Sequence, residues 1–286
     1  MKFFQTLTKL FWIARPISWP NTAYPFAAAY LLSGGAIDAT LIIGTLYFLG
    51  PYNLLMYGVN DVFDYESDIK NPRKGGVEGM REARAFHPTI IRAAAITNAP
   101  FIIYLLLAGD WASRAVFIAI VFGVVAYSLK GLRFKEKPIL DSITSSLHFV
   151  GPALFGLSLF AFPANAWPFI IAFFLWGMAS HAFGAVQDII PDRKGKLASI
   201  ATIFGARATI WVSMALYLAA AVLVGLQGIQ FMPLVLAGAV YVLNLAPYAF
   251  VTDRTSASTN KAWKRFLWLN YVAGAIVTLV IIAAVI

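Results

Sequence analysis

The stretch NDVFDYESD, residues 60–68, gathers carboxylates at the end of an apolar run. Asn60, Asp64 and Asp68 are spaced four residues apart, and on a helix that spacing places the three side chains on one face. Like charges at this spacing repel each other and destabilise the helix unless something positive lies against them. The pattern therefore predicts a cation or a cationic partner beside Asp64 and Asp68.

A second acidic cluster, QDIIPDRKGK at residues 187–196, follows another apolar run much later in the chain. Asp188 and Asp192 repeat the spacing of four residues. Pro191 has no backbone N–H, so we expect the helix to kink or end near it. Ionisable groups at the ends of membrane segments are costly and usually functional, which favours a role in binding or catalysis for these aspartates.

Carboxylate oxygens at this density suit Mg²⁺, which binds a few protein carboxylates and takes its other ligands from water and substrate phosphates. We therefore interpret Asp64, Asp68, Asp188 and Asp192 as ligands of Mg²⁺ ions that hold a diphosphate. The alternative is that the charges in these loops are solvated and only balance one another. We adopt that alternative for the other charged residues of the first loop: Glu66, Glu78, Glu82, Lys70, Arg73 and Lys74.

A basic segment, YSLKGLRFKEKP at residues 127–138, can supply the complementary charge. Lys130, Arg133 and Lys135 are candidates for binding diphosphate oxygens and for stabilising the leaving group as its charge develops. Tyr127 lies about one helical turn before them. Each of these bases can equally be an ordinary loop charge of a membrane protein. Arg15, near the N-terminus, is a weaker candidate of the same kind.

The composition predicts the elements that must position these residues. Hydrophobic residues make up 60% of the 286 residues and charged residues only 12%, against about 25% in soluble domains. Apolar runs long enough to cross a bilayer as helices recur along the chain. We predict an all-α integral membrane protein, a single domain over residues 1–286, with nine transmembrane helices in one bundle. Cysteine is absent, which excludes disulfides, thiolate metal sites and a cysteine nucleophile.

The orientation of the predicted helices follows from the basic residues. Of the 22 lysines and arginines, all but Arg114 lie in the N-terminal segment or in and beside the loops near 63–92, 130–138, 188–206 and 252–265. The N-terminus and both acidic clusters are therefore expected on the cytoplasmic side of the cell membrane. This bias explains the net charge of +9, so a nucleic-acid partner has no support. The nine spans are expected at residues 17–35, 39–62, 91–109, 111–129, 139–161, 166–187, 207–226, 231–251 and 266–286.

The segment before the first span, FFQTLTKLFWI at residues 3–13, is amphipathic and predicts a helix that lies in the membrane interface. Carboxylates for a metal and bases for phosphate at the cytoplasmic ends of membrane helices indicate chemistry on an isoprenyl diphosphate. Metal-assisted loss of diphosphate leaves an allylic cation, which a lipid-soluble acceptor attacks.

These residues resemble the two signature motifs of the UbiA-type intramembrane prenyltransferases, here NDVFDYESD and DIIPD. The resemblance covers nearly the whole chain, including an Arg-Pro pair near the start, a basic loop after the fourth span, and nine spans. Either motif alone is weak, because short aspartate patterns are common. The resemblance implies that the aspartates bind Mg²⁺ and diphosphate, that three of them are catalytic (Asp64, Asp188 and Asp192), and that two neighbours support them: Asn60 and Asp61.

The basic loop departs from the family pattern. The family often has Tyr-x-x-x-Lys here, but the residue four positions after Tyr127 is Gly131, and the lysine comes one position early, at Lys130. The departure leaves open which base contacts the diphosphate. Arg133 and Lys135 are favoured.

Within the family, residues 180–209 and 133–142 look most like the lycopene elongase branch of carotenoid pathways. That resemblance implies transfer of C5 units from dimethylallyl diphosphate to the ends of lycopene, giving C45 and C50 carotenoids. The acceptor would be an alkene, so its attack leaves a tertiary cation that loses a proton or takes up water. His181 lies two helical turns before Asp188 on the same face, where it either removes a proton or is hydrogen-bonded between helices.

Two other functions remain open from the sequence. A prenyltransferase of this family can act on an aromatic or quinone-precursor acceptor, since the choice depends on pocket shape. A cation-coupled membrane transporter also carries intramembrane aspartates. Transporters more often place such charges near mid-membrane on interrupted helices, whereas here they lie at one membrane face.

Overall fold

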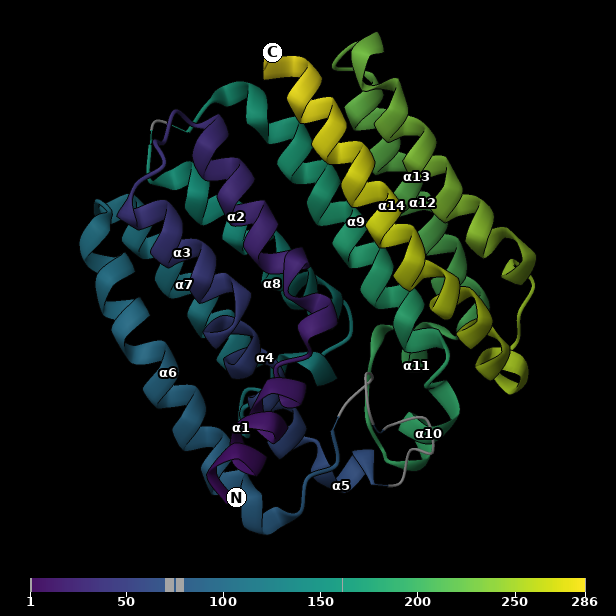
Figure 1. The fold of residues 1–286 in the computed structure, drawn as a ribbon. Helices are drawn as coiled ribbons and strands as arrows, with labels where there is room; N and C mark the ends of the chain where they lie inside the picture. The colour runs from purple at the N-terminus through teal and green to yellow at the C-terminus, as the bar shows by residue number, and fades with distance from the viewer. Residues whose placement is uncertain (1, 70–74, 76–79, 161, 286) are drawn as a thin grey trace. The chain divides into compact units, whose positions relative to one another are not determined.

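The computed structural model describes residues 2–69, 75, 80–160 and 162–285 (Figure 1). This part of the chain is helical and contains no strand. The chain divides into two compact units. The N-terminal unit comprises Met1–Phe134 and Leu147–Ala164, and the C-terminal unit comprises Lys135–Ser146 and Asn165–Ile286. The single domain over residues 1–286 stays a prediction, and each unit is described by itself.

The N-terminal unit is built from apolar helices around aromatic side chains. Phe117 and Phe155 have ring centroids 4.6 Å apart, and Phe26, Phe48 and Tyr52 belong to the same buried cluster. The helices of this unit are α1 (Lys2–Ile13), α2 (Pro20–Leu32), α3 (Ala39–Leu49), α4 (Pro51–Phe63), α5 (Tyr65–Asp68), α6 (His87–Ala108), α7 (Trp111–Ser128) and most of α8 (Leu140–Ser158).

Two helices of this unit approach closely because one of them carries a glycine. A Cβ atom at Gly156 of α8 would lie 2.8 Å from the carbonyl oxygen of Phe26 and 3.1 Å from the amide nitrogen of Tyr30, both in α2. Backbone atoms cannot move aside as a flexible side chain can. Only glycine therefore allows α8 to lie this near to α2.

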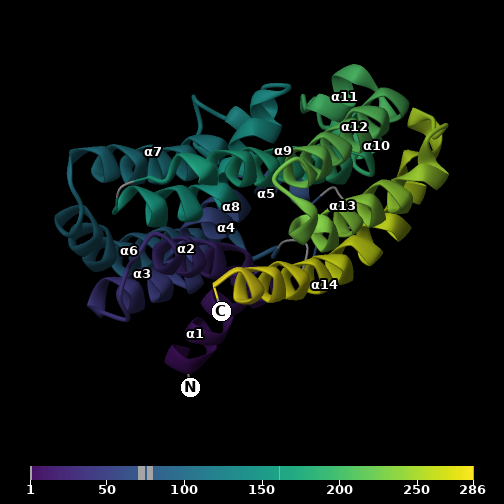
Figure 2. The same cartoon turned by 90° about the horizontal axis from the view of Figure 1, so that it is seen from above.

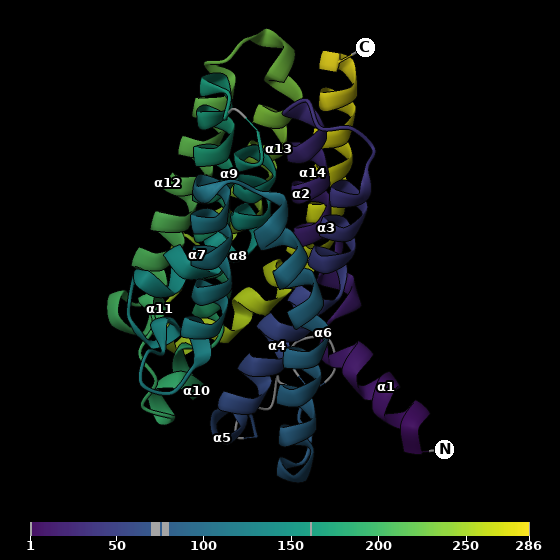
Figure 3. The ribbon, with the colours of Figure 1, turned by 90° about the vertical axis from the view of Figure 1, so that its left-hand side faces the viewer.

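Helix α1 agrees with the predicted interfacial helix. Phe3, Phe4 and Trp12 are exposed, whereas Ile13 is buried against Leu54 of α4. Figures 2 and 3 show α1 projecting away from the other helices of the N-terminal unit. An exposed aromatic face on a projecting helix is expected where the surrounding solvent is lipid and headgroup rather than water alone.

The C-terminal unit places four long helices together, with aromatic stacks between them. Tyr217 stacks on Tyr241 with centroids 5.1 Å apart, and Trp263 stacks on Phe266 at 4.9 Å. Figure 1 shows α14 in yellow alongside α13 in this unit. The helices are α9 (Trp167–Val186), α10 (Ile189–Lys194), α11 (Ile200–Phe204), α12 (Ala206–Gly225), α13 (Met232–Leu245) and α14 (Asn260–Val285).

Seven helical segments among the described residues are long and apolar enough to cross a membrane. They are Ala39–Phe63, Arg84–Ala108, Trp111–Ser128, Ala164–Val186, Ala206–Gly225, Ile229–Tyr248 and Asp253–Ala284. The other two expected spans coincide with α2, which has 13 residues, and α8, which has 19. A multi-pass helical membrane protein is thus confirmed, while the count of nine stays a prediction.

Two aspartates outside the acidic clusters begin helices. Asp38 accepts a hydrogen bond from the amide of Leu41 at 2.9 Å and caps α3, and Asp110 accepts one from the amide of Ser113 at 2.9 Å and caps α7. These amide hydrogen bonds favour the ionised carboxylates and lower the pKa of Asp38 and of Asp110. Their charge is therefore explained by capping.

Candidate active site

The first acidic cluster lies at a break between two helices. Helix α4 ends at Phe63, Asp64 is its C-terminal cap, and α5 carries Asp68 at its end. The motif thus lies across a helix break, and the spacing of one turn is kept across it. The amide of Asp64 donates to the carbonyl of Asn60 at 2.9 Å, and the amide of Asp68 donates to the carbonyl of Asp64 at 2.8 Å. Both aspartates are buried, with 7% and 6% of their surface exposed.

Arg133 supplies the positive charge that the sequence predicts beside this cluster. Its Nη2 atom lies 3.6 Å from Oδ1 of Asp64, and its Nη1 donates to the carbonyl of Phe63 at 3.4 Å. Arg133 has a φ angle of 39°, in the left-handed region that non-glycine residues rarely adopt. The backbone turns here so that the guanidinium reaches the end of α4. A loose contact of this length leaves the guanidinium able to bind an anion as well.

Asn60 is held by a residue that the sequence did not single out. The hydroxyl of Ser128, at the end of α7, donates to Oδ1 of Asn60 at 2.9 Å. Because the carbonyl oxygen receives this bond, the amide NH₂ group of Asn60 is the part directed elsewhere. Beside Ser128, the ring of Tyr127 contacts His148 edge to face at 5.0 Å. The only sequence cue to Ser128 is its position directly after Tyr127.

Asp61 forms a buried ion pair. Arg15 Nη2 donates to Asp61 Oδ1 at 2.7 Å, and the amide of Met80 donates to Asp61 Oδ2 at 3.2 Å. The guanidinium of Arg15 also lies over the ring of Tyr57, 4.2 Å from its centroid. Asp61 therefore joins the end of α4 to the segment after α1 and to the chain near Met80. This clamp gives Asp61 and Arg15 a structural role that the sequence did not indicate.

Glu66 agrees with the solvated alternative, whereas the side chain of Glu82 is only 13% exposed. Glu66 pairs with Arg84, and both side chains are largely exposed; Glu82 pairs with Lys9. The other residues assigned to this alternative lie outside the described residues: Lys70, Arg73, Lys74 and Glu78.

The second acidic cluster also lies at a helix break. Helix α9 ends at Val186, and Asp188 is the N-cap residue of the short helix α10. The predicted interruption is confirmed, but it comes before Asp188 rather than at Pro191. Pro191 is the third residue of α10, where no intrahelical N–H bond is lost. The amide of Asp192 donates to the carbonyl of Asp188 at 2.9 Å, so these aspartates are again one turn apart.

Arg193, beside this pair, is occupied by structural contacts. Its guanidinium donates to the carbonyl of Thr202 and, at 2.6 Å, to Oδ2 of Asp253. The two bases predicted to bind phosphate together with Arg133 are Lys130, which is exposed after α7, and Lys135, which is partly exposed in a short 3₁₀ helix. Lys135 belongs to the C-terminal unit, and Arg133 to the N-terminal unit.

Each aspartate pair fits a hard cation. Within the described ranges no three His, Asp or Glu side chains converge, so neither pair alone forms a complete all-protein site. Two carboxylates one turn apart, with the remaining positions left to phosphate oxygens and water, are what Mg²⁺ requires in phosphate-binding sites. The pairs belong to different units. The assignment of Asp64, Asp68, Asp188 and Asp192 as metal ligands stays a prediction.

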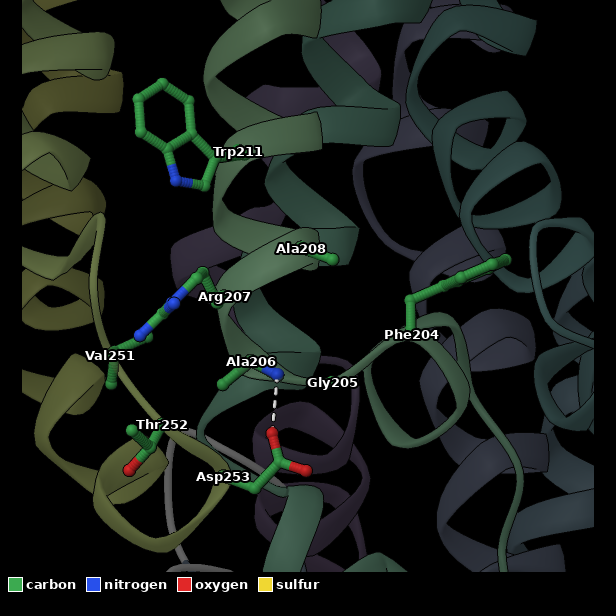
Figure 4. Close-up of a pocket in the computed structure, with 9 residues that line it drawn as sticks. All are labelled: Phe204, Gly205, Ala206, Arg207, Ala208, Trp211, Val251, Thr252 and Asp253. Atoms are coloured by element: carbon green, nitrogen blue, oxygen red, sulfur yellow. Dashed lines mark hydrogen bonds between the residues drawn. The ribbon is translucent and has the colours of Figure 1, made fainter.

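Two cavities of the C-terminal unit are lined by other residues. The larger, of about 560 Å³, lies around the start of α12, where Asp253 accepts a hydrogen bond from the amide of Ala206 at 2.7 Å (Figure 4). The smaller, of about 280 Å³, is lined by apolar side chains and by Ser142 and Thr209. Neither is lined by a residue that the sequence predicts for the site.

Comparison with known proteins identifies the family. The UbiA prenyltransferase family matches residues 22–270. A C(50) beta-cyclic carotenoids biosynthesis protein of Dietzia is 50% identical over 98% of this chain, which spans 65% of that protein's length. A lycopene elongase/hydratase of Corynebacterium glutamicum is 49% identical over 94% of this chain and 95% of its own length. These names agree with the branch that residues 180–209 resemble.

Solved structures share the fold. A UbiA homologue from Archaeoglobus fulgidus bound to DMAPP and Mg²⁺ has a TM-score of 0.64 at 18% identity, over 93% of this chain and 98% of its own. A UbiA homologue from Aeropyrum pernix has a TM-score of 0.67 at 18% identity, over 94% of this chain and 99% of its own. With the family match, the expectation of a prenyl-transferring enzyme is confirmed at the level of the family. The chain belongs to the UbiA prenyltransferase family.

Proposed function

We propose that this chain transfers the C5 dimethylallyl group from dimethylallyl diphosphate to lycopene, in a reaction that depends on Mg²⁺ and gives C45 and C50 carotenoids. The observation that carries the proposal is a pair of buried aspartates one turn apart with Arg133 beside them. It occurs in a chain that is 49% identical to a lycopene elongase/hydratase.

In this proposal the acidic residues bind the metal, and the basic and amide side chains bind the diphosphate. Asp64 and Asp68, with Asp188 and Asp192, would hold Mg²⁺, which when bound neutralises diphosphate charge and makes it a better leaving group. Arg133 binds diphosphate oxygens through its guanidinium fork as the C–O bond breaks. The amide NH₂ of Asn60, oriented by Ser128, donates to the same group. Tyr127, Lys130 and Lys135 complete the proposed set of diphosphate-binding residues.

The membrane arrangement belongs to the same proposal. Helices α2 and α8 complete nine crossings of the cell membrane, and the N-terminus and both aspartate motifs face the cytoplasm. The support is the distribution of Lys and Arg, which leaves only Arg114 on the opposite side. A water-soluble diphosphate donor then reaches the aspartates from the cytoplasm, while lycopene arrives through the lipid.

The test is an assay of membranes that contain the protein, Mg²⁺, labelled dimethylallyl diphosphate and lycopene, followed by pigment chromatography. Labelled C45 or C50 pigment is expected, EDTA should abolish it, and added Mg²⁺ should restore it. Asp64→Asn and Asp188→Asn should each lose activity while the protein remains in the membrane. Glu66→Gln is the matched control, because Glu66 lies between the two aspartates of the first motif and pairs with exposed Arg84.

Each result has a distinct meaning. Full activity in Asp64→Asn would overturn the metal assignment. Product with an aromatic or quinone-precursor acceptor, but none with lycopene, would retain the site and overturn the carotenoid acceptor. Absence of transfer to every acceptor, with a cation flux that depends on Asp64, would favour the transporter.

A further inference from the structure

The start of α8 carries a buried carboxylate that the proposed diphosphate site does not use. Asp141 and Ser142 are both fully buried. Oδ1 of Asp141 accepts the amide of Ser142 at 2.7 Å and the hydroxyl of Ser142 at 3.3 Å. Oδ2 accepts the amide of Ile200, at the beginning of α11, at 2.7 Å. Three hydrogen-bond donors therefore surround this buried carboxylate.

Ser142 connects this carboxylate to a histidine. Its Oγ atom lies 3.0 Å from Nδ1 of His181 on α9. A serine hydroxyl has one hydrogen; we assign it to Asp141, whose Oδ1 lies 3.3 Å away, and in that arrangement Nδ1 of His181 donates to Ser142. The neutral ring then carries its basic lone pair on Nε2. Asp141 and Ser142 thus select the tautomer of His181 and fix the plane of its ring.

His181 lies in the last third of α9, the helix that leads to the second acidic cluster. It lies five residues before α9 ends at Val186, and Asp188 follows one residue after the C-cap of that helix, Gln187. His181 is partly exposed, whereas its neighbours Ser180, Ala182 and Phe183 are buried. A prenyl chain that extends into the membrane from a diphosphate at Asp188 and Asp192 runs toward His181.

We propose that His181 is the proton acceptor that ends the transfer, with Ser142 and Asp141 as the residues that position it. This inference rests on the proposed function. The C–O bond to diphosphate breaks and its electron pair leaves with the oxygen, while the acceptor's π pair forms the new C–C bond and leaves a tertiary cation. A proton then passes to Nε2 of His181. It comes from the adjacent carbon, whose C–H pair closes the new double bond, or from a water molecule that has added to the cation.

The carboxylate favours this step. Proton transfer turns His181 into a cation inside the membrane segment, where an isolated charge is costly. Asp141, one hydroxyl away, supplies the opposite charge. Without the acceptor the tertiary cation persists until the new C–C bond breaks again and its electron pair returns to the acceptor's double bond. Water then captures the released dimethylallyl cation as an alcohol, in place of elongated pigment.

The experiment measures diphosphate released and C–C bonds formed in the same reaction. In the wild-type protein the two amounts should be equal. His181→Gln should lower elongated pigment on the order of 100-fold, with a smaller loss of diphosphate release, so their ratio rises. Ser142→Ala should raise the ratio in the same direction. Ser142→Thr should restore it, because Ser142 lines the 280 Å³ cavity, which can accept a methyl group.

The control is Ser180→Ala, on the neighbouring position of α9, whose hydroxyl contacts Tyr217 at 2.9 Å instead. Its ratio should remain at the wild-type value. A ratio near one in both His181→Gln and Ser142→Ala, whether activity is retained or lost in parallel, would overturn the proposal and leave His181 as a link between α8 and α9. If His181→Gln does not insert, the Ser142→Ala and Ser142→Thr pair decides. Failure of the wild-type protein to elongate lycopene would instead refute the proposed function.

Discussion

Removing the carboxylate of Asp61 should lower the stability of the folded protein. It should not abolish prenyl transfer in the protein that remains folded. Asp61 and Arg15 are paired at 2.7 Å with only 3% and 13% of their side chains exposed. In Asp61→Ala the guanidinium of Arg15 stays buried beside Tyr57 and loses its countercharge. Breaking one side of such a pair costs about 3–5 kcal/mol. In a chain of this size that lowers the midpoint of thermal unfolding by on the order of 10 °C.

The comparison with Asp64 makes this prediction specific. Nη2 of Arg133 lies 3.6 Å from Oδ1 of Asp64, and Asp68 is one turn along the chain with the same charge. Asp64→Ala relieves that repulsion and removes an ion pair that is longer than the Asp61–Arg15 pair, so it should destabilise the protein less than Asp61→Ala does. Its prenyl transfer should nevertheless be abolished. The two neighbouring aspartates should thus give opposite patterns of stability and activity.

The assay is thermal unfolding in detergent, followed by tryptophan fluorescence, with transfer activity measured at a temperature where every variant is folded. The double variant Arg15→Met/Asp61→Leu is the control, because replacing both partners leaves no unpaired charge and should recover much of the lost stability. The clamp would be refuted if Asp61→Ala unfolded at the wild-type temperature and had lost Mg²⁺-dependent turnover. That result would move Asp61 into the metal site.

Three further predictions test other parts of the structure. Gly156→Ala should destabilise the N-terminal unit by about 1–3 kcal/mol in the same unfolding assay, because its Cβ meets the backbone of α2, while Gly274→Ala, with nothing within 4 Å, should not. Arg133→Ala should lower kcat/KM for dimethylallyl diphosphate on the order of 10- to 100-fold; an unchanged value would remove Arg133 from the diphosphate site. Because the chain has no cysteine, single cysteines at exposed Glu66 and Trp111 should react with an impermeant maleimide from opposite membrane sides. Labelling from one side would refute the proposed topology.

Much of the architecture was predictable because it depends on local sequence. The length of an apolar run decides whether a helix can cross a membrane, so seven of the nine expected spans were recovered directly. The spacing of four residues decides that Asp64 and Asp68, or Asp188 and Asp192, lie one turn apart. That spacing held even though each motif lies at a helix break, since amide-to-carbonyl bonds of one turn link Asn60, Asp64 and Asp68 across the first break and link Asp188 to Asp192 after the second.

The local backbone at the two motifs was less predictable. Pro191 correctly indicated an interruption of the helix, but not its position. Proline is tolerated in the first turn of a helix, and Pro191 lies in the first turn of α10, so the break falls before Asp188. No proline or glycine marks the break at Asp64. The positive φ angle at Arg133 was also not predictable. The glycine in this turn is Gly131, two residues earlier, and Arg133 itself adopts a conformation that non-glycine residues rarely take.

The sequence by itself determined the membrane class, the family and the two aspartate motifs, because hydrophobic length, charge and spacing are properties of short segments. Tertiary structure alone decided the partners of the individual polar side chains. It pairs Asp61 with Arg15 across 46 positions of the chain, Asn60 with Ser128 across 68, and Ser142 with His181 across 39. A buried charge or amide must find a partner wherever helix packing provides one. That choice depends on which helix faces meet, and a single sequence does not specify it.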